Sequence, residues 1–189
     1  MKKSLKCAKF EEVIPHGDYH IFTDGATFNN GRKDPNLPSL GGWGFVVLNN
    51  NKDIILEDSG FPITETTISL MEMEAVIQSI KQFIKSKCTR SNYENPINIT
   101  ITSDSQYVIT GITEWIYNWK KKNWLNNERK PVANKEQWET IAALSGIDCG
   151  KVVNITWFKC KSHTNFREND LADKLASLAL KDCRKYFGV

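Results

Sequence analysis

The sequence has no paired cysteine motif and no long apolar run, and these absences exclude two classes of protein. Its five cysteines, at positions 7, 88, 149, 160 and 183, form no Cys-X-X-Cys pair, and their odd number argues against a secreted disulfide framework. No apolar stretch approaches the length of a membrane-spanning helix. We therefore expect no membrane partner and a reducing, intracellular location, which is the cytoplasm or, in a eukaryote, the nucleus.

A strong charge of one sign is also missing. The formal net charge of +3 is too small to indicate a nucleic-acid partner by itself, so the position of the charges matters more than their sum. A length of 189 residues, of which 40% are hydrophobic, suits one domain with a substantial core. Residues 1–17 contain lysines but no apolar signal region, so we expect a short solvated extension, followed by one domain over residues 18–189.

The hydrophobic pattern predicts a mixture of strands and helices. Strands are expected at residues 19–23, 42–48, 53–61, 97–102 and 152–158, and helices at residues 67–87, 105–121 (as short pieces), 134–144 and 168–183. The first three strands should form an antiparallel meander, with a loop at residues 29–41 that is rich in Gly, Pro and Asn. This order implies an α/β fold in which a mixed five-stranded sheet is flanked by helices.

Acidic residues follow two of these strands and lie on the first helix. If the strands before Asp24 and Asp104 are parallel neighbours, their ends bring the two carboxylates together. Helical spacing places Glu72 on the apolar face, whereas Glu74 points toward Gln78 and water. A single Asp in a turn is usually a cap, but three converging acids indicate a site for a hard cation such as Mg²⁺, which prefers oxygen ligands.

Six short motifs follow one another along residues 19 to about 181: Thr23-Asp24-Gly25-Ala26, Met71-Glu72, Ser103 to Val108, Thr113 to Lys121, Lys130 to Asn134, and Lys161-Ser162-His163 with Glu168 to Asp173. None is specific alone, but their order and spacing together are. The chain resembles the type 1 ribonuclease H family, in its cellular and bacterial-like branch. The resemblance implies the ribonuclease H-like fold and a catalytic domain over residues 18–189.

The resemblance implies an endonuclease that hydrolyses the RNA strand of an RNA/DNA hybrid and leaves 5′-phosphate and 3′-hydroxyl ends. Its cofactor would be two Mg²⁺ ions, for which Mn²⁺ could substitute. In the family pattern Asp24 bridges the ions, Glu72 and Asp104 bind one, and Asp173 binds the other. His163, ten residues before Asp173, would transfer a proton or help the product leave. Residues 164–167 depart from the glycine-rich family loop, which leaves the release rate open.

A second segment suits nucleic-acid binding. Residues 115–130 contain five basic residues against one acid, a local net charge of +4. Lys120, Lys121 and Lys122 could neutralise backbone phosphates, while Trp115 and Trp119 could offer flat faces to the sugars or shape the segment. Tryptophans four residues apart on a helix are equally typical of core packing, and we expect at least one of them to pack there. The segment resembles the basic protrusion, or handle, of the family.

Recognition of RNA requires contacts to the 2′-hydroxyl. The resemblance implies that the backbone at Gly25 and Thr27 supplies them, together with Glu72 and Gln106, and that Asn134 adds a polar contact. The loop at residues 27–41 is longer than in compact bacterial relatives. It is either a neutral insertion or an added lip over the substrate groove.

Three alternatives remain at this point. A ribonuclease H domain of a reverse transcriptase would share the site, but the initial Met and the lack of a polymerase segment favour a stand-alone, monomeric enzyme with no obligate protein partner. A catalytically inactive hybrid-binding module would keep the handle and lose an acid, and all four acids are present. A DNA integrase or resolvase of the same fold should lack the handle and the Asp104-Ser105-Gln106 motif.

Overall fold

A computed structural model describes residues 18–88, 95–146, 152–161 and 167–189, so the predicted extension at residues 1–17 lies outside the described residues. Strands and helices follow in the order β1 (Tyr19–Phe28), β2 (Leu40–Asn49), β3 (Ile54–Gly60), α2 (Ile68–Lys87), β4 (Ile97–Ser103), α3 (Gln106–Thr110), the π-helical η2 (Gly111–Trp115), α4 (Ile116–Lys121), α5 (Lys135–Leu144), β5 (Val153–Lys159) and α6 (Arg167–Phe187). None of these helices is long and apolar enough to cross a membrane.

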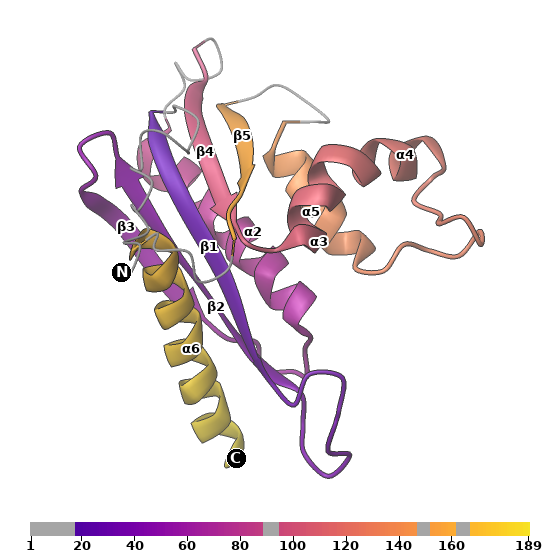
Figure 1. The fold of residues 1–189 in the computed structure, drawn as a ribbon. Helices are drawn as coiled ribbons and strands as arrows, with labels where there is room; N and C mark the ends of the chain where they lie inside the picture. Colours follow the sequence, from indigo (N-terminus) through magenta and orange to yellow (C-terminus); the bar gives the residue numbers. More distant parts are fainter. Residues whose placement is uncertain (1–17, 89–94, 147–151, 162–166) are drawn as a thin grey trace, which may run out of the picture.

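The strands form one mixed five-stranded sheet in the order β3-β2-β1-β4-β5, with β1 at its centre (Figure 1). β1 pairs antiparallel with β2, and β2 pairs antiparallel with β3. β4 runs parallel to β1, and β5 runs parallel to β4. The predicted α/β class, the antiparallel meander and the mixed sheet are therefore confirmed.

The predicted end of the first strand is wrong. β1 does not stop at Asp24 but continues to Phe28, because its antiparallel pairing with β2 persists to Phe28 and Leu40. Only the parallel pairing with β4 stops early, at Phe22 and Thr102. The Asp-Gly pair suggested a turn, but hydrogen bonds to a neighbouring strand outweigh this local preference. The following loop is also shorter than predicted, covering residues 29–39, because β2 begins at Leu40.

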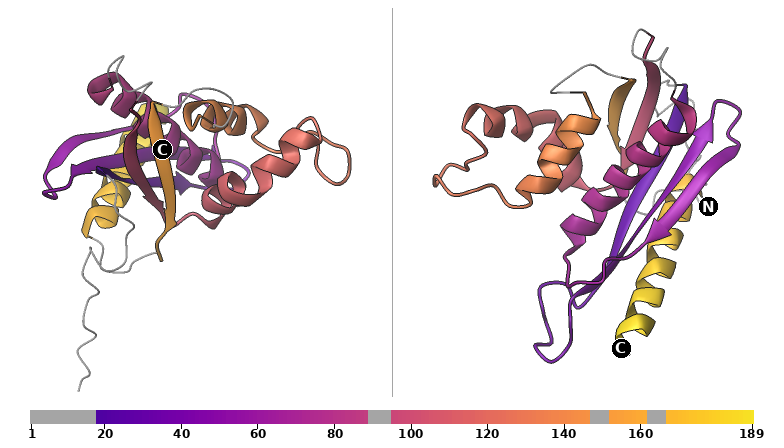
Figure 2. Two further views of the ribbon diagram at one scale, coloured as in Figure 1. Left: turned by 90° about the horizontal axis from the view of Figure 1, so that it is seen from above. Right: turned by 180° about the vertical axis from the view of Figure 1, so that it is seen from behind.

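Helices cover both faces of the sheet, as the two further views in Figure 2 show. On one face, α2 and α5 pack over a large core that includes Ile21, Phe45, Ile101 and the fully buried Trp138. On the other face, α6 packs over a smaller core of Phe22, Val46, Leu48 and Ala172. Because successive strand residues point to opposite faces, Ile21 and Phe22 belong to different cores.

α2 begins and packs as its sequence predicts. The hydroxyl oxygen of Thr67 accepts a hydrogen bond from the backbone N–H of Leu70 at 3.3 Å, which satisfies one of the free donors of the first turn. Its apolar residues Met73, Val76, Ile77, Ile80 and Phe83 are buried, and Ile84 packs against them. One face of α2 is thereby fixed against the sheet.

α6 lies directly on the backbone of β2. A Cβ atom at Gly44 would lie 2.6 Å from the backbone N of Ala176, and one at Gly42 would lie 2.4 Å from the backbone N of Leu180. Real Cβ atoms do not approach backbone atoms so closely, and backbone is harder to displace than a flexible side chain. The two glycines therefore set the distance between helix and sheet.

Gly44→Ala should destabilise the fold by about 1–3 kcal/mol, because the added methyl group must push α6 away from β2. Urea unfolding, followed by circular dichroism, measures this loss. Gly31→Asn is the control, since nothing lies within 4 Å of a Cβ there and asparagine tolerates its φ of +72°. An unchanged midpoint for Gly44→Ala would show that the interface yields without cost.

Candidate active site

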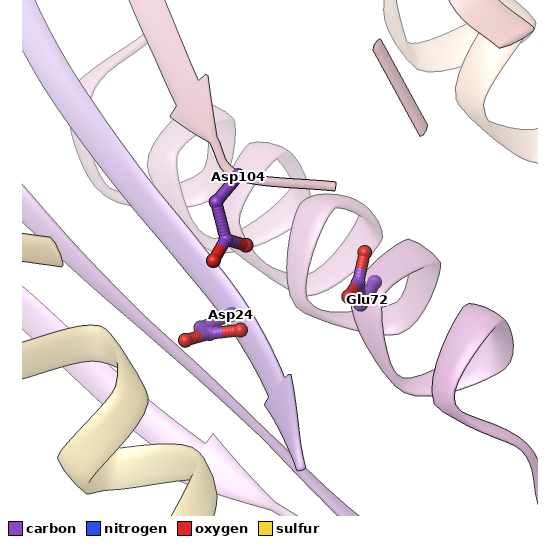
Figure 3. A group of neighbouring side chains, drawn as sticks. All are labelled: Asp24, Glu72 and Asp104. Carbon is purple, nitrogen blue, oxygen red and sulfur yellow. The ribbon is translucent and has the colours of Figure 1, made fainter. Parts of the chain in front are cut away.

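Three of the four predicted acids meet at one point of the structure (Figure 3). Asp24, Glu72 and Asp104 each offer a carboxylate oxygen, and these three atoms lie within 4.8 Å of one another. They come from β1, α2 and the residue after β4, so segments far apart in the sequence build the group. The convergence predicted from the strand ends and the helical phase is confirmed.

Strand register places Asp24 beside Asp104. The parallel pairing ends with Phe22 opposite Thr102, and two further residues along each strand lead to the two aspartates. The chain then turns into α3, where the hydroxyl oxygen of Ser105 accepts a hydrogen bond from the backbone N–H of Val108 at 3.3 Å. β4 ends here, whereas β1 continues, so Asp24 lies within a strand and Asp104 at a strand end.

Close packing of α2 on β1 places Glu72 beside Asp24. A Cβ atom at Gly25 would lie 2.6 Å from the backbone N of Glu72, so only glycine allows the helix to lie this close to the strand. The helical phase is also as predicted, because the carboxylate of Glu74 accepts a hydrogen bond from Gln78 at 2.6 Å instead of entering the group. Gly25 thus has a structural reason to be glycine.

Burial and mutual repulsion make full ionisation of the group unfavourable. Desolvation first, and then the charges of Asp104, Asp173 and Glu72, raise the pKa of Asp24 to about 7, although its carboxylate accepts a hydrogen bond from the Gly25 N–H at 2.7 Å. Desolvation, and then the charge of Asp104, also raise the pKa of Glu72 to about 7, against the effect of a hydrogen bond from Ser105.

The residues of this group fit a hard divalent cation. All three ligands are carboxylates, and Oε2 of Glu72 is buried with no hydrogen-bond partner among the described residues. A buried carboxylate oxygen without a partner is costly unless a cation or a proton compensates for it. A cation at this point would bind that oxygen and would offset both the desolvation and the repulsion that raise the two pKa values.

Two predicted catalytic residues remain, Asp173 and His163. Asp173 lies on the exposed surface of α6 and outside the group of three, but its charge is close enough to contribute to the raised pKa of Asp24. The structure therefore places it beside the cluster, not within it. His163 lies outside the described residues.

The predicted contacts to the RNA strand lie on several elements. Gly25 and Thr27 follow Asp24 on β1, where both are half-buried. Gln106 is exposed at the start of α3, and its amide donates a hydrogen bond to Thr110. Asn134 precedes α5 with a φ of +57° and does not cap the helix; its amide donates to the hydroxyl of Tyr107 at 3.1 Å.

An aromatic framework supports the predicted handle. Trp115 and Trp119 lie 5.6 Å apart between ring centroids, and Trp119 lies 5.5 Å from the buried Trp138 of α5. Trp119 packs against the main core, which confirms that at least one of the two tryptophans is a packing residue, whereas Trp115 remains 37% exposed. The sequence did not indicate that Trp138 joins this aromatic group, because its contacts arise only where α5 packs near η2.

α4 and the loop after it, which carry the charged part of the handle, project away from the sheet (Figure 1). Lys121 and Lys122 are exposed, Lys120 is half-buried, and Nζ of Lys122 donates to the side-chain oxygen of Asn127 at 2.9 Å. An isolated bridge between Leu125 and Pro131 closes the base of the following loop. The exposed lysines therefore lie on a closed loop and the end of α4, next to the aromatic rings.

Comparison with known proteins identifies relatives of this chain. The RNase H family model matches residues 16–181. Ribonuclease H of Geotalea uraniireducens is 34% identical over 85% of this chain and 92% of its own length. Ribonuclease H of Ruthia magnifica subsp. Calyptogena magnifica is 37% identical over 85% of this chain and 93% of its own length.

Solved structures share the fold. LC9-RNase H1, described as a type 1 RNase H with the type 2 active-site motif, superposes with a TM-score of 0.70 at 22% identity, over 89% of this chain and 74% of that one. LC11-RNase H1 in complex with an RNA/DNA hybrid superposes with a TM-score of 0.63 at 20% identity, over 87% and 97% of the two chains. With its acids, its sheet and its sequence in agreement, the chain belongs to the ribonuclease H family of enzymes.

Proposed function

We propose that the protein hydrolyses the RNA strand of RNA/DNA hybrids endonucleolytically, with two divalent metal ions, and leaves 5′-phosphate and 3′-hydroxyl ends. The observation that carries this proposal is the group of three carboxylates within 4.8 Å of one another. Family membership and the position of Asp173 beside the group support it. A solved relative bound to an RNA/DNA hybrid supports the choice of substrate.

Each acid has a separate part in the proposed chemistry. Asp24, whose pKa the charges of Asp104, Asp173 and Glu72 all raise, is the acid best placed to bridge two ions. Glu72 and Asp104 would complete one ion site, and Asp173 would complete the other. When bound, the ions supply positive charge to the attacking and leaving oxygens of the phosphodiester, at a separation of roughly 3.5–4 Å.

Mg²⁺ is the ion that we propose, with Mn²⁺ as a substitute, because the three clustered ligands are all carboxylates and contain no sulfur or nitrogen donor. His163 would transfer a proton or assist product release. Because one chain supplies all of these acids, we propose that a monomer is sufficient.

The proposed hybrid path runs from the acids to the handle. Gly25, Thr27 and Gln106 lie on the elements that carry Asp24 and follow Asp104, which suits contacts to the RNA strand near the cleaved bond. The handle would hold the DNA strand, with Lys121 and Lys122 on its phosphates and the exposed face of Trp115 against a sugar.

The protein should cleave the RNA strand of a labelled RNA/DNA hybrid with Mg²⁺ and not with EDTA. Matching RNA and DNA duplexes should remain intact, because neither combines an RNA strand at the acids with a DNA strand at the handle. Gel electrophoresis of the products, with end-group analysis, measures both the substrate and the ends. Cleavage of the DNA duplex, or cleavage in EDTA, would contradict the proposal.

Asp24→Asn and Asp104→Asn test the site in the same assay. Each should lower the cleavage rate by on the order of 10³-fold while hybrid binding persists. Glu74→Gln is the matched control, because Glu74 lies on α2 two residues from Glu72 but bonds to Gln78 outside the group. Near-normal turnover in either aspartate variant would remove that residue from the catalytic group.

Stability without metal should fall as the pH rises. Both pKa values of about 7 lie above those of unfolded Asp and Glu, so the folded protein holds these protons more tightly. The resulting stabilisation is complete below about pH 4 and is lost as the pH rises to 7, on the order of 3–4 kcal/mol for each acid. Melting temperatures from pH 5 to 8 in EDTA and in Mg²⁺ measure this change.

Asp24→Asn should flatten this pH dependence in EDTA and raise the melting temperature at pH 8, because it removes one buried charge. Mg²⁺ should have the same effect on the unchanged protein. Glu74→Gln should keep the steep dependence. Parallel pH curves for the Asp24→Asn variant and the unchanged protein in EDTA would show that burial and the neighbouring charges do not raise the pKa of Asp24.

Replacing Lys120, Lys121 and Lys122 by Ala should weaken hybrid binding and reduce the slope of log Kd against log salt by about 1–3, because fewer counterions are released. Fluorescence anisotropy with a labelled hybrid in Ca²⁺ or EDTA measures binding without cleavage. Replacing the exposed Lys81, Lys85 and Lys87 of α2 gives the same change in net charge outside the handle. Equal slopes for the two triple variants would exclude a specific role of the handle.

A further inference from the structure

Cys160 joins two parts of the structure that carry different acids. Its backbone N–H donates to the carbonyl oxygen of Ser103 at 3.2 Å, directly before Asp104. Its thiol donates to Oδ1 of Asn169 at 3.4 Å, in the first turn of α6. Both side chains are buried, with 3% and 6% of their surface exposed. One residue after β5 therefore contacts both the end of β4 and the start of α6.

This contact lies at the N-terminal end of α6, which is the end that carries Asp173. Asn169 precedes Asp173 by four residues, so the two side chains lie on the same side of the helix, one turn apart. α6 packs mainly on β2 and β1, on the far side of β4 from β5. The Cys160–Asn169 hydrogen bond ties its first turn to the strands that lead to Asp104.

Asp173 needs such a connection because it stands outside the group of three acids. Asp24 and Asp104 are fixed by strand register, and Glu72 by the contact of α2 with Gly25, whereas the position of Asp173 depends on where the first turns of α6 lie. A small shift or rotation of these turns would move the Asp173 carboxylate relative to Asp24.

We propose that Cys160 and Asn169 are positioning residues, which hold the first turn of α6 so that Asp173 and Asp24 share a metal ion. The inference deepens the proposed function and rests on it, since it takes Asp173 to be a metal ligand. It gives the buried thiol a role in metal binding without direct contact to the ion, as residues that orient metal ligands have in other proteins.

The chemistry of the thiol suits this role. Burial, and then the charges of Asp104 and Asp24, raise the pKa of Cys160 to about 11, so the sulfur keeps the proton that it donates. A protonated, buried thiol is a poor nucleophile. Asn169 supplies a neutral amide oxygen, which accepts this proton without adding a further negative charge beside the carboxylates.

Mn²⁺ binding to the full chain without nucleic acid, followed by electron paramagnetic resonance, tests the inference. Cys160→Val removes the donor and should weaken binding of the ion that depends on Asp173 by on the order of tenfold. Cys160→Ser keeps a donor and should restore most of the affinity. Cys183→Val is the matched control. Like Cys160, Cys183 is buried, but it lies on α6 ten residues beyond Asp173.

A double-mutant comparison separates positioning from general destabilisation. If Cys160 acts through Asp173, then Cys160→Val should weaken Mn²⁺ binding in the unchanged protein and have no further effect in Asp173→Asn. A purely structural role predicts that Cys160→Val lowers the melting temperature but leaves the Mn²⁺ affinity as high as in Cys183→Val. That result, the same loss of Mn²⁺ affinity in both backgrounds, or no effect of Asp173→Asn itself would overturn the inference.

The two proposals can fail separately. The Mn²⁺ titration contains no substrate, so it reports on the geometry of Asp173 whether or not the protein cleaves hybrids. The cleavage assay on the unchanged protein reports on the substrate whether or not Cys160 contributes to metal binding.

Discussion

The burial of three carboxylates that also repel one another is the constraint on which the rest of the structure depends. Asp24, Glu72 and Asp104 are held within 4.8 Å of one another, and the pKa of each of the first two rises to about 7. Because the net stability of a folded domain is only about 5–15 kcal/mol, it can hold such a group only if the surrounding elements are firmly packed. Perturbed pKa values of this kind are typical of functional sites, where a ligand compensates for the stored repulsion.

The packing that holds these acids comes from both faces of the sheet. α2 lies on β1 closely enough to require glycine at position 25, and α6 lies on β2 closely enough to require glycine at position 44. The central position of β1 lets one strand contribute to both cores, through Ile21 on one side and Phe22 on the other. The same glycines that allow dense packing therefore also fix the distances between the acids, and the contact between Cys160 and Asn169 extends this arrangement toward Asp173.

In the handle, packing and charge are carried by different residues that alternate along its sequence. Trp119 packs against Trp138 and the main core, while Lys121 and Lys122 remain exposed. The interleaving of aromatic and basic residues indicated nucleic-acid binding from the sequence, but it could not assign each tryptophan to packing or to a surface. That assignment depends on α5, which follows the handle in the chain and carries Trp138.

The sequence by itself determined the order of strands and helices, the face of α2 that carries Glu72, and the family, because these follow from local periodicity and from motifs in fixed order. It did not determine where β1 ends, since the pairing with β2 outweighs the turn preference of Asp24 and Gly25. Only the tertiary structure decided that Asp173 stands beside the group of three acids instead of within it, and that a buried thiol contacts the helix of this fourth acid. Such distances arise from packing between segments far apart in the chain, and no local pattern encodes them.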